Sequence, residues 1–278
     1  MDSAQSLATL YLNLWSGEKG GVGKSFCCGM DCQRHIDRNQ PFYLIDADKK
    51  NATVRSYYGD YALDKDVFFS EAPERASTAN WLLEAATKRP VVANCRAGTL
   101  DSLLTWVEQK QVVPIARQQG VQLRYFFVSD LEHASLNLFP VTAEQVAPLM
   151  PIIFVANYGC NRTDDSYFQS AGFQGLLAQY EVPVVKVNLF DLEMRKVMDG
   201  RNPEGHLMTW GEAQSYGEFG ILGQSEVQLF LESFYEQLDA AERFADLAFS
   251  NRTSSPSVNG GKAKGVSASA RKRNSGDG

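Results

Sequence analysis

The chain has 278 residues, 44% of them hydrophobic and 22% charged, with a formal net charge of -6, which is the composition of a globular protein with room for one large α/β domain. The first apolar run, Leu7 to Trp15, is interrupted by Asn13 and is far too short to span a membrane, so we expect neither a transmembrane segment nor an export signal. The five cysteines are odd in number and lack zinc-like spacing, which indicates reduced thiols and a cytoplasmic protein.

Apolar, β-branched and aromatic runs alternate with longer segments of helical pattern, which predicts βαβ units. The expected fold is a doubly wound α/β domain over residues 1–250, with a mostly parallel sheet and helices on both faces. We expect strands near Thr9 to Leu14, Phe42 to Ile45, Val91 to Asn94, Leu123 to Val128, Ile152 to Ala156 and Val184 to Val187. We expect helices from Lys24 to about Ile36, Ala76 to Lys88, Leu100 to Gln118 (or broken before Pro114), Tyr167 to Gln179 and Ser225 to about Phe249.

The first expected strand runs directly into the glycine-rich sequence GEKGGVGKS, residues 17–25. A loop of consecutive backbone N–H groups that opens a helix N-terminus can surround phosphate oxygens, and glycine permits the close approach. Lys24 can reach the β- and γ-phosphates of a nucleotide, and Ser25 can place its hydroxyl on Mg²⁺. The predicted ligands of this loop are therefore a nucleoside triphosphate and Mg²⁺, and the family resemblance described next implies that the nucleotide is ATP. The predicted nucleotide-binding residues of this loop are Gly20, Gly21, Val22, Gly23, Lys24, Ser25 and Phe26.

The ordinary pattern GxxxxGK[ST] fails here because Glu18 stands where its first glycine should be, whereas the deviant pattern KGGxGK[ST] matches fully through Lys19. The chain thereby resembles the ParA/MinD family of deviant Walker A ATPases. The resemblance implies an ATP-dependent homodimer in which Lys19 reaches across to the partner's bound phosphates. A chance glycine-rich turn with two solvated lysines is the alternative interpretation of the same residues.

Two acidic residues follow the second expected strand, in Ile45-Asp46-Ala47-Asp48. An Asp at the carboxyl edge of a strand beside the phosphates can organise the metal shell or orient the attacking water. By its match to the family's D-x-D pattern, Asp48 is the candidate for positioning water and Asp46 the candidate for the Mg²⁺ shell. Turn formation and solvation are the alternative for two such residues taken alone.

The third motif departs from the family, because Asn94 stands at the end of the third expected strand where the family has an Asp. We assign Asn94 to the metal shell. It brings no negative charge, so weaker organisation of Mg²⁺ and slow or absent hydrolysis are expected. Asp130, at the end of the next strand, is the alternative acid.

The fifth expected strand ends at Asn157, and the resemblance implies that an Asn at this place helps to read the adenine. Turn formation is its alternative role. Residues 188–195, after the sixth strand, are expected to form the other wall of the base pocket. Residues 200–223 contain six glycines and are expected to be irregular, as a mobile surface loop or a simple connection.

The last expected helix has apolar residues at three- and four-residue spacing and an acidic polar face, which favours packing against the sheet over membrane binding. Residues 251–278 then carry six basic side chains and one acidic one, a net of +5 that leaves -11 on the rest. Few large apolar residues remain there, so a disordered basic tail is expected. Weak nonspecific DNA binding and a mere solubility role are both open for this tail.

Taken together, the motifs and the resemblance predict an ATP-binding, ATP-hydrolysing dimeric switch. Family members of this kind act in plasmid or DNA partition, in conjugative mobilisation, or in positioning cargo, and they work with an activating or cargo protein that this sequence does not identify. Two other classes remain open. One is a nucleotide-dependent binding or scaffold protein with little ATPase activity, suggested by Asn94; the other is a kinase or amidoligase-type enzyme on the same fold.

Overall fold

A computed structural model describes residues 10–48, 53–69, 77–161 and 164–254. Its centre is a six-stranded sheet in the order β2-β3-β1-β4-β5-β6, in which every neighbouring pair is parallel. The predicted α/β class is confirmed, and β3 and β6 have the expected bounds. The strands are β1 (Leu10–Ser16), β2 (Tyr43–Asp46), β3 (Val91–Asn94), β4 (Val121–Ser129), β5 (Ile152–Asn157) and β6 (Val184–Val187).

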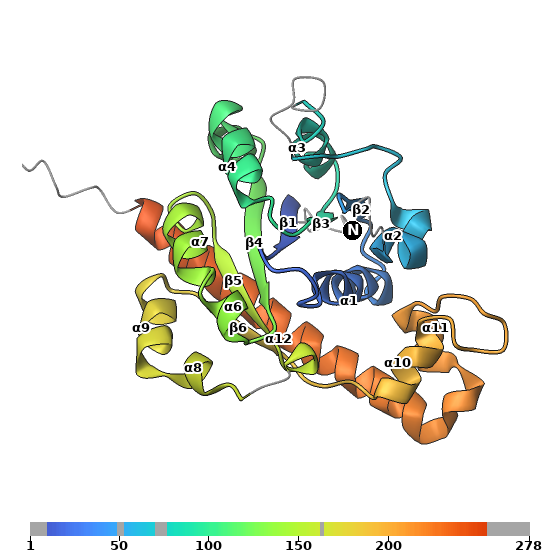
Figure 1. Ribbon diagram of the computed structural model, residues 1–278. Coiled ribbons are helices and arrows are strands. Elements are labelled where there is room, and N and C mark those ends of the chain that lie inside the picture. Colours follow the sequence, from blue (N-terminus) through green and yellow to red (C-terminus); the bar gives the residue numbers. More distant parts are fainter. Residues whose placement is uncertain (1–9, 49–52, 70–76, 162–163, 255–278) are drawn as a thin grey trace, which may run out of the picture.

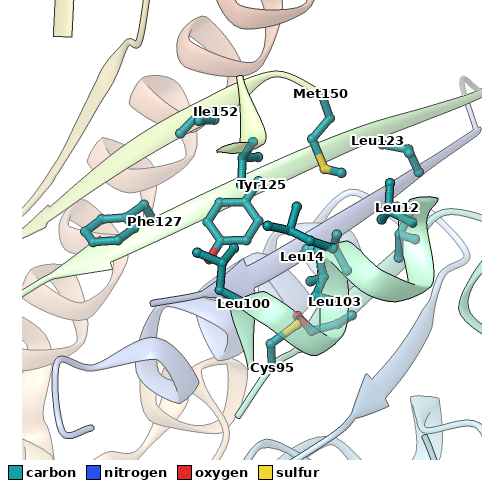
Figure 2. Packing of buried hydrophobic residues seen from close by; sticks show 14 of the residues in the cluster. Leu12, Leu14, Cys95, Leu100, Leu103, Leu123, Tyr125, Phe127, Met150 and Ile152 are labelled. Carbon is teal, nitrogen blue, oxygen red and sulfur yellow. Dashed lines mark hydrogen bonds between the residues drawn. The ribbon is translucent and has the colours of Figure 1, made fainter. Parts of the chain in front are cut away.

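Helices bury both faces of the sheet, which explains why its strands are mostly apolar rather than alternating between apolar and polar residues. Along β4, Tyr125 and Phe127 belong to one hydrophobic cluster, while the alternating residues Phe126 and Val128 belong to the other. Figure 2 shows the first cluster, in which side chains of β1 and β4 gather with Leu103 of α4. Successive strand residues therefore contribute to opposite layers of the core.

Helices cover each face of the sheet (Figure 1). The cluster of Figure 2 is completed by α3 (Asn80–Ala86), α4 (Leu100–Gln109), α5 (Val112–Gln118), α6 (His133–Leu136), α7 (Phe139–Val146), α8 (Ser166–Gln169) and α9 (Ala171–Gln179). The opposite cluster is completed by α1 (Lys24–Asp37), α2 (Thr53–Tyr58), α10 (Leu192–Met198), α11 (Trp210–Ser215) and α12 (Gly220–Ser254). Three 3-10 turns follow α2, β5 and α11 along the chain: η2 (Gly59–Tyr61), η3 (Tyr158–Cys160) and η4 (Gly217–Phe219).

Two expected helical segments are each broken into two: residues 100–118, for which a break before Pro114 is one of the two expectations, and residues 167–179, which are expected as one helix. The first break does fall before Pro114, at Gln111, which has a left-handed φ of 53° and caps α5. Pro114 lies in the first turn of α5, where its missing N–H costs no helical hydrogen bond. The second break falls at Ser170, whose hydroxyl accepts from the Phe173 N–H and so caps α9.

The glycine-rich segment 200–223 is more ordered than its composition predicts, because it contains α11, η4 and the start of α12. Thr209 and Glu212 form a capping box at the start of α11. The Trp210 ring is buried and stacks on Phe230 of α12, with ring centroids 5.6 Å apart. A buried aromatic therefore anchors this connection to the domain.

The long helix α12 packs its apolar side chains on the β5–β6 side of the sheet, as expected from its pattern (Figure 1). It also carries a buried acid, Glu242, which binds Arg34 of α1 at 2.9 Å and lies 3.5 Å from Arg124 of β4. The helix continues to Ser254, past the boundary expected at residue 250, and the rest of the basic segment lies outside the described residues. None of the helices in the described ranges has the length and apolar character that crossing a membrane requires.

Neither edge strand of the sheet is bare. At β2, the Leu63 N–H donates to the Leu44 carbonyl at 2.9 Å, next to a bridge between Leu44 and Ala62. At β6, the side-chain amide of Gln237 binds both backbone groups of Lys186, accepting from its N–H at 3.0 Å and donating to its carbonyl at 3.2 Å. Gln237 is a residue of α12, so this helix covers part of the β6 edge.

Candidate functional site

The glycine-rich loop connects the carboxyl end of β1 to the first turn of α1, the arrangement predicted from the sequence. Gly21 and Gly23 have φ values of 78° and 92°, in the left-handed region that favours glycine. Gly23 is also the N-cap of the 14-residue helix α1, so the loop leads directly into the unsatisfied N–H groups of the first helical turn. This combination of backbone donors and helix dipole favours a bound anion.

Asn157, at the end of β5, packs against this loop and binds its backbone. Its Nδ2 donates to the Val22 carbonyl at 2.9 Å, and the side chain is only 2% exposed. A Cβ added at Gly23 would lie 2.1 Å from the same Nδ2 atom, so Asn157 leaves no space for a side chain at position 23. The structure thus gives Asn157 a contact with the loop, and its role in reading a base stays a prediction.

The two lysines of the loop have different surroundings. Lys24 is 7% exposed and donates to the Lys19 carbonyl at 3.1 Å, and burial lowers the pKa of its ammonium while the Asp48 carboxylate raises it. Lys19 binds Asp130 at 2.5 Å and Glu132 at 2.7 Å, and these hydrogen bonds raise its pKa. Asp130, the alternative acid of the sequence analysis, is therefore the partner of Lys19.

Asp46, Asn94 and Ser25 come together at the ends of β2 and β3 and the start of α1. The Asn94 Nδ2 donates to Asp46 Oδ1 at 3.0 Å and to Ser25 Oγ at 3.2 Å. Burial raises the pKa of Asp46, and the Arg55 N–H, Asn94 and the Asp48 N–H oppose that rise by donating to its carboxylate. The three residues predicted for the Mg²⁺ shell are thus neighbours.

Asn94 nevertheless does not fit the role of a Mg²⁺ ligand, because it turns its NH₂ group, rather than its oxygen, toward Asp46 and Ser25. Magnesium binds oxygen ligands in near-octahedral geometry. Over the described ranges, no three or more His, Cys, Asp or Glu side chains cluster so that they could hold a metal ion. Asp48 lies beside this group, donating its N–H to Asp46 at 3.2 Å, and its buried Oδ1 has no hydrogen-bond partner in the described part of the chain.

A cavity of about 180 Å³ opens next to the loop. Its walls come from the start of α1, the end of β5 with η3, and the segment after β6, and several of residues 188–195 line one side. That these residues form a wall of a base pocket stays a prediction. The lining residues are Phe26, Asn157, Gly159, Cys160, Asn188, Leu189, Phe190, Leu192 and Arg195. The guanidinium of Arg195 lies 4.8 Å from the Phe26 ring centroid, a cation–π contact that the sequence did not predict because no motif links these distant residues.

A larger cavity, of about 480 Å³, lies between the end of β6 and α12. It shares Asn188 and Leu189 with the smaller one. Its lining includes neither Phe26, the residue that follows the glycine-rich loop, nor Asn157, so its size alone does not make it the candidate site. The smaller cavity is the better candidate because it is lined by Phe26 and by Asn157, whose amide binds the Val22 carbonyl of the loop.

No family model and no curated protein sequence matches this chain. Among solved structures, it is similar to a nucleotide-binding protein in complex with ADP from Archaeoglobus fulgidus, with 17% identity, a TM-score of 0.44, and 69% of this chain and 86% of that one covered. It is also similar to the signal recognition particle receptor FtsY from Elizabethkingia anophelis, with 15% identity, a TM-score of 0.41, and 81% and 66% covered. These values are too low to assign a function.

Proposed function

We propose that this chain binds ATP at the loop of residues 17–25 and acts as a nucleotide-dependent switch of the ParA/MinD type. The observation that carries the proposal is the loop itself, which joins a strand to a helix with two left-handed glycines and a buried lysine, Lys24. The triphosphate would lie on the backbone N–H groups of the loop and the first turn of α1. Lys24 would supply the charge for the β- and γ-phosphates.

The base would enter the cavity of about 180 Å³ beside the loop. Phe26 and Arg195 offer a flat aromatic and cationic surface there, while Asn157 offers a polar group at the wall. Asp48 would orient the attacking water, since its charge acts on Lys24 and one of its carboxylate oxygens has no partner within the described residues.

Lys19 would bind the partner's phosphates in the dimer, and its contacts in the single chain explain why dimerisation would depend on nucleotide. In the single chain Lys19 is held by Asp130 and Glu132. To reach a partner's phosphates it must exchange these carboxylates for the phosphate oxygens, which carry a higher density of negative charge. ATP in a second copy would therefore favour the exchange.

In the cell, the proposed switch would act in plasmid or DNA partition, in mobilisation, or in positioning cargo, together with an activating protein. DNA contact through residues 251–278 belongs to the same proposal. A nucleotide-dependent scaffold with little hydrolysis is the second candidate, and the amide at Asn94 favours it because it supplies no charge for a metal shell. Turnover measured with and without DNA separates these two candidates.

Calorimetric titration with ATP tests the binding proposal. Wild type should bind, and Lys24→Ala should bind roughly 10- to 100-fold more weakly, because the variant lacks a charged hydrogen-bond donor to phosphate. Lys110→Ala, which removes an exposed lysine at the end of α4, is the matched control and should bind like wild type. Unchanged affinity in a folded Lys24→Ala variant would show that the loop is not the nucleotide site.

A further inference from the structure

The amide group of Asn94 occupies a position fixed by the sheet. β3 runs between β2 and β1, and strand register pairs Asn94 with Asp46 on one side and Trp15 on the other. The side chain is 1% exposed, and its Nδ2 lies 3.0 Å from Asp46 Oδ1 and 3.2 Å from Ser25 Oγ. The position of this amide is therefore fixed by the buried sheet, unlike that of an exposed side chain.

The neighbours determine which end of this amide faces them. Asp46 also accepts from the Asp48 N–H through Oδ1 and from the Arg55 N–H through Oδ2, so its carboxylate acts as an acceptor on both oxygens. An amide turned end for end would place its carbonyl oxygen against a carboxylate oxygen, which is repulsive. The NH₂ end must face Asp46, and the buried Asn94 Oδ1 then has no hydrogen-bond partner within the described residues.

A divalent cation at this place would bind the same two oxygens, Asp46 Oδ1 and Ser25 Oγ, that the NH₂ group now bridges. Mg²⁺ would need them as ligands at about 2.0–2.1 Å, in a shell that the N–H donors do not fit. With an amide in place of an acid, the site also carries one negative charge less to repel the phosphates. Less positive charge is then required to hold a triphosphate beside Lys24.

We infer that the NH₂ group of Asn94 substitutes for the divalent cation, so that this chain binds its nucleotide with little dependence on Mg²⁺. The inference rests on the proposed ATP site and specifies its metal requirement. Asn94 is then the residue that determines this requirement. Restoring the acid should restore the dependence.

The test is the affinity for a fluorescent ATP analogue, measured in excess Mg²⁺ and again in EDTA. For wild type, the dissociation constants in the two solutions should agree within about threefold. For Asn94→Asp, removal of Mg²⁺ should weaken binding by roughly tenfold or more, because an uncompensated carboxylate then faces the phosphates. Asn137→Asp, which adds the same charge at an exposed position after α6, should behave like wild type.

A second readout uses Mg²⁺ alone, without nucleotide. The salt should leave the melting temperature of wild type unchanged relative to matched NaCl, and it should raise that of Asn94→Asp, in which two carboxylates would face each other. Wild type that binds the analogue only in Mg²⁺ would overturn the inference and leave the ATP proposal standing. Wild type that binds in neither solution would overturn both the inference and the ATP proposal. The comparison of wild type in the two solutions tests the inference even if Asn94→Asp fails to fold.

Discussion

Replacing Gly23 by alanine should destabilise the domain more than the same change at Gly21 or Gly20, because the three glycines differ in backbone and in surroundings. Gly23 has a φ of 92°, and an added Cβ would lie 2.1 Å from the Asn157 amide nitrogen. Gly21 has a φ of 78° but open space around its Cβ position, and Gly20 has open space and no left-handed backbone. The series therefore separates backbone strain from steric overlap.

The expected magnitudes follow from these features. A left-handed backbone costs a non-glycine residue about 1–2 kcal/mol, which is the prediction for Gly21→Ala. In Gly23→Ala, Asn157 must also move and break its hydrogen bond to the Val22 carbonyl, worth about 0.5–1.5 kcal/mol. Adding the two ranges gives about 1.5–3.5 kcal/mol for Gly23→Ala, while Gly20→Ala should stay within about 0.5 kcal/mol of wild type.

Urea unfolding without nucleotide measures the free energy of unfolding of the three variants, and ATP titration of each then reports whether the loop still binds. Affinity should fall in the same order as stability, because the loop donors are displaced along with the backbone. Equal stability of Gly23→Ala and Gly21→Ala would show that the contact with Asn157 does not constrain the loop. Equal stability of Gly23→Ala and Gly20→Ala would refute the strain argument as well.

Three further predictions concern Lys19, His35 and the C-terminal segment. Lys19→Ala should keep its affinity for ATP within about threefold but no longer dimerise on addition of ATP, which light scattering measures; a variant that still dimerises would exclude the proposed role of this lysine. Burial lowers the pKa of His35 from 6.5 to about 4, so the folded chain favours the neutral ring. The free energy of unfolding should therefore be highest above pH 6.5 and fall by up to about 3 kcal/mol as the pH drops toward 4, with a flatter profile in His35→Gln, and an unchanged profile would contradict this account. Deletion of residues 255–278 should weaken DNA binding and reduce its salt dependence, by up to about 0.9 in log-log slope for each DNA phosphate that this segment neutralises. Equal anisotropy titrations of the full and shortened chains would exclude a DNA role for that segment.

The sequence was sufficient to predict the fold because local hydrophobic patterns mark the strands and helices that form both layers of its core. Apolar runs such as residues 125–128 within β4 are typical of strands buried on both faces, and the glycine-rich loop marks the start of α1. The same patterns placed Ser25, Asp46 and Asn94 at the carboxyl edge of the sheet, where the structure brings them together. Parallel strands account for this success, since their carboxyl ends meet on one side.

The details that the sequence could not supply depend on contacts between distant residues. Nothing local indicates that Lys19 pairs with Asp130, more than a hundred residues away, or that Arg195 lies over Phe26. The orientation of the Asn94 amide depends equally on its neighbours. In residues 200–223 the abundance of glycine obscured a short helix, whose stability comes from the burial of Trp210 against α12.

The covered edges of the sheet restrict how copies of this chain can assemble. A β-strand of a second molecule that approached β6 would find both backbone groups of Lys186 already bound by Gln237. One that approached β2 would meet the chain at Ala62 and Leu63 instead of a free carbonyl at Leu44. Strand addition at these positions, the usual route to edge-to-edge aggregation, would first have to break contacts of the folded monomer. For the proposed dimer, these contacts favour association through loops and helices, where the glycine-rich loop and Lys19 lie.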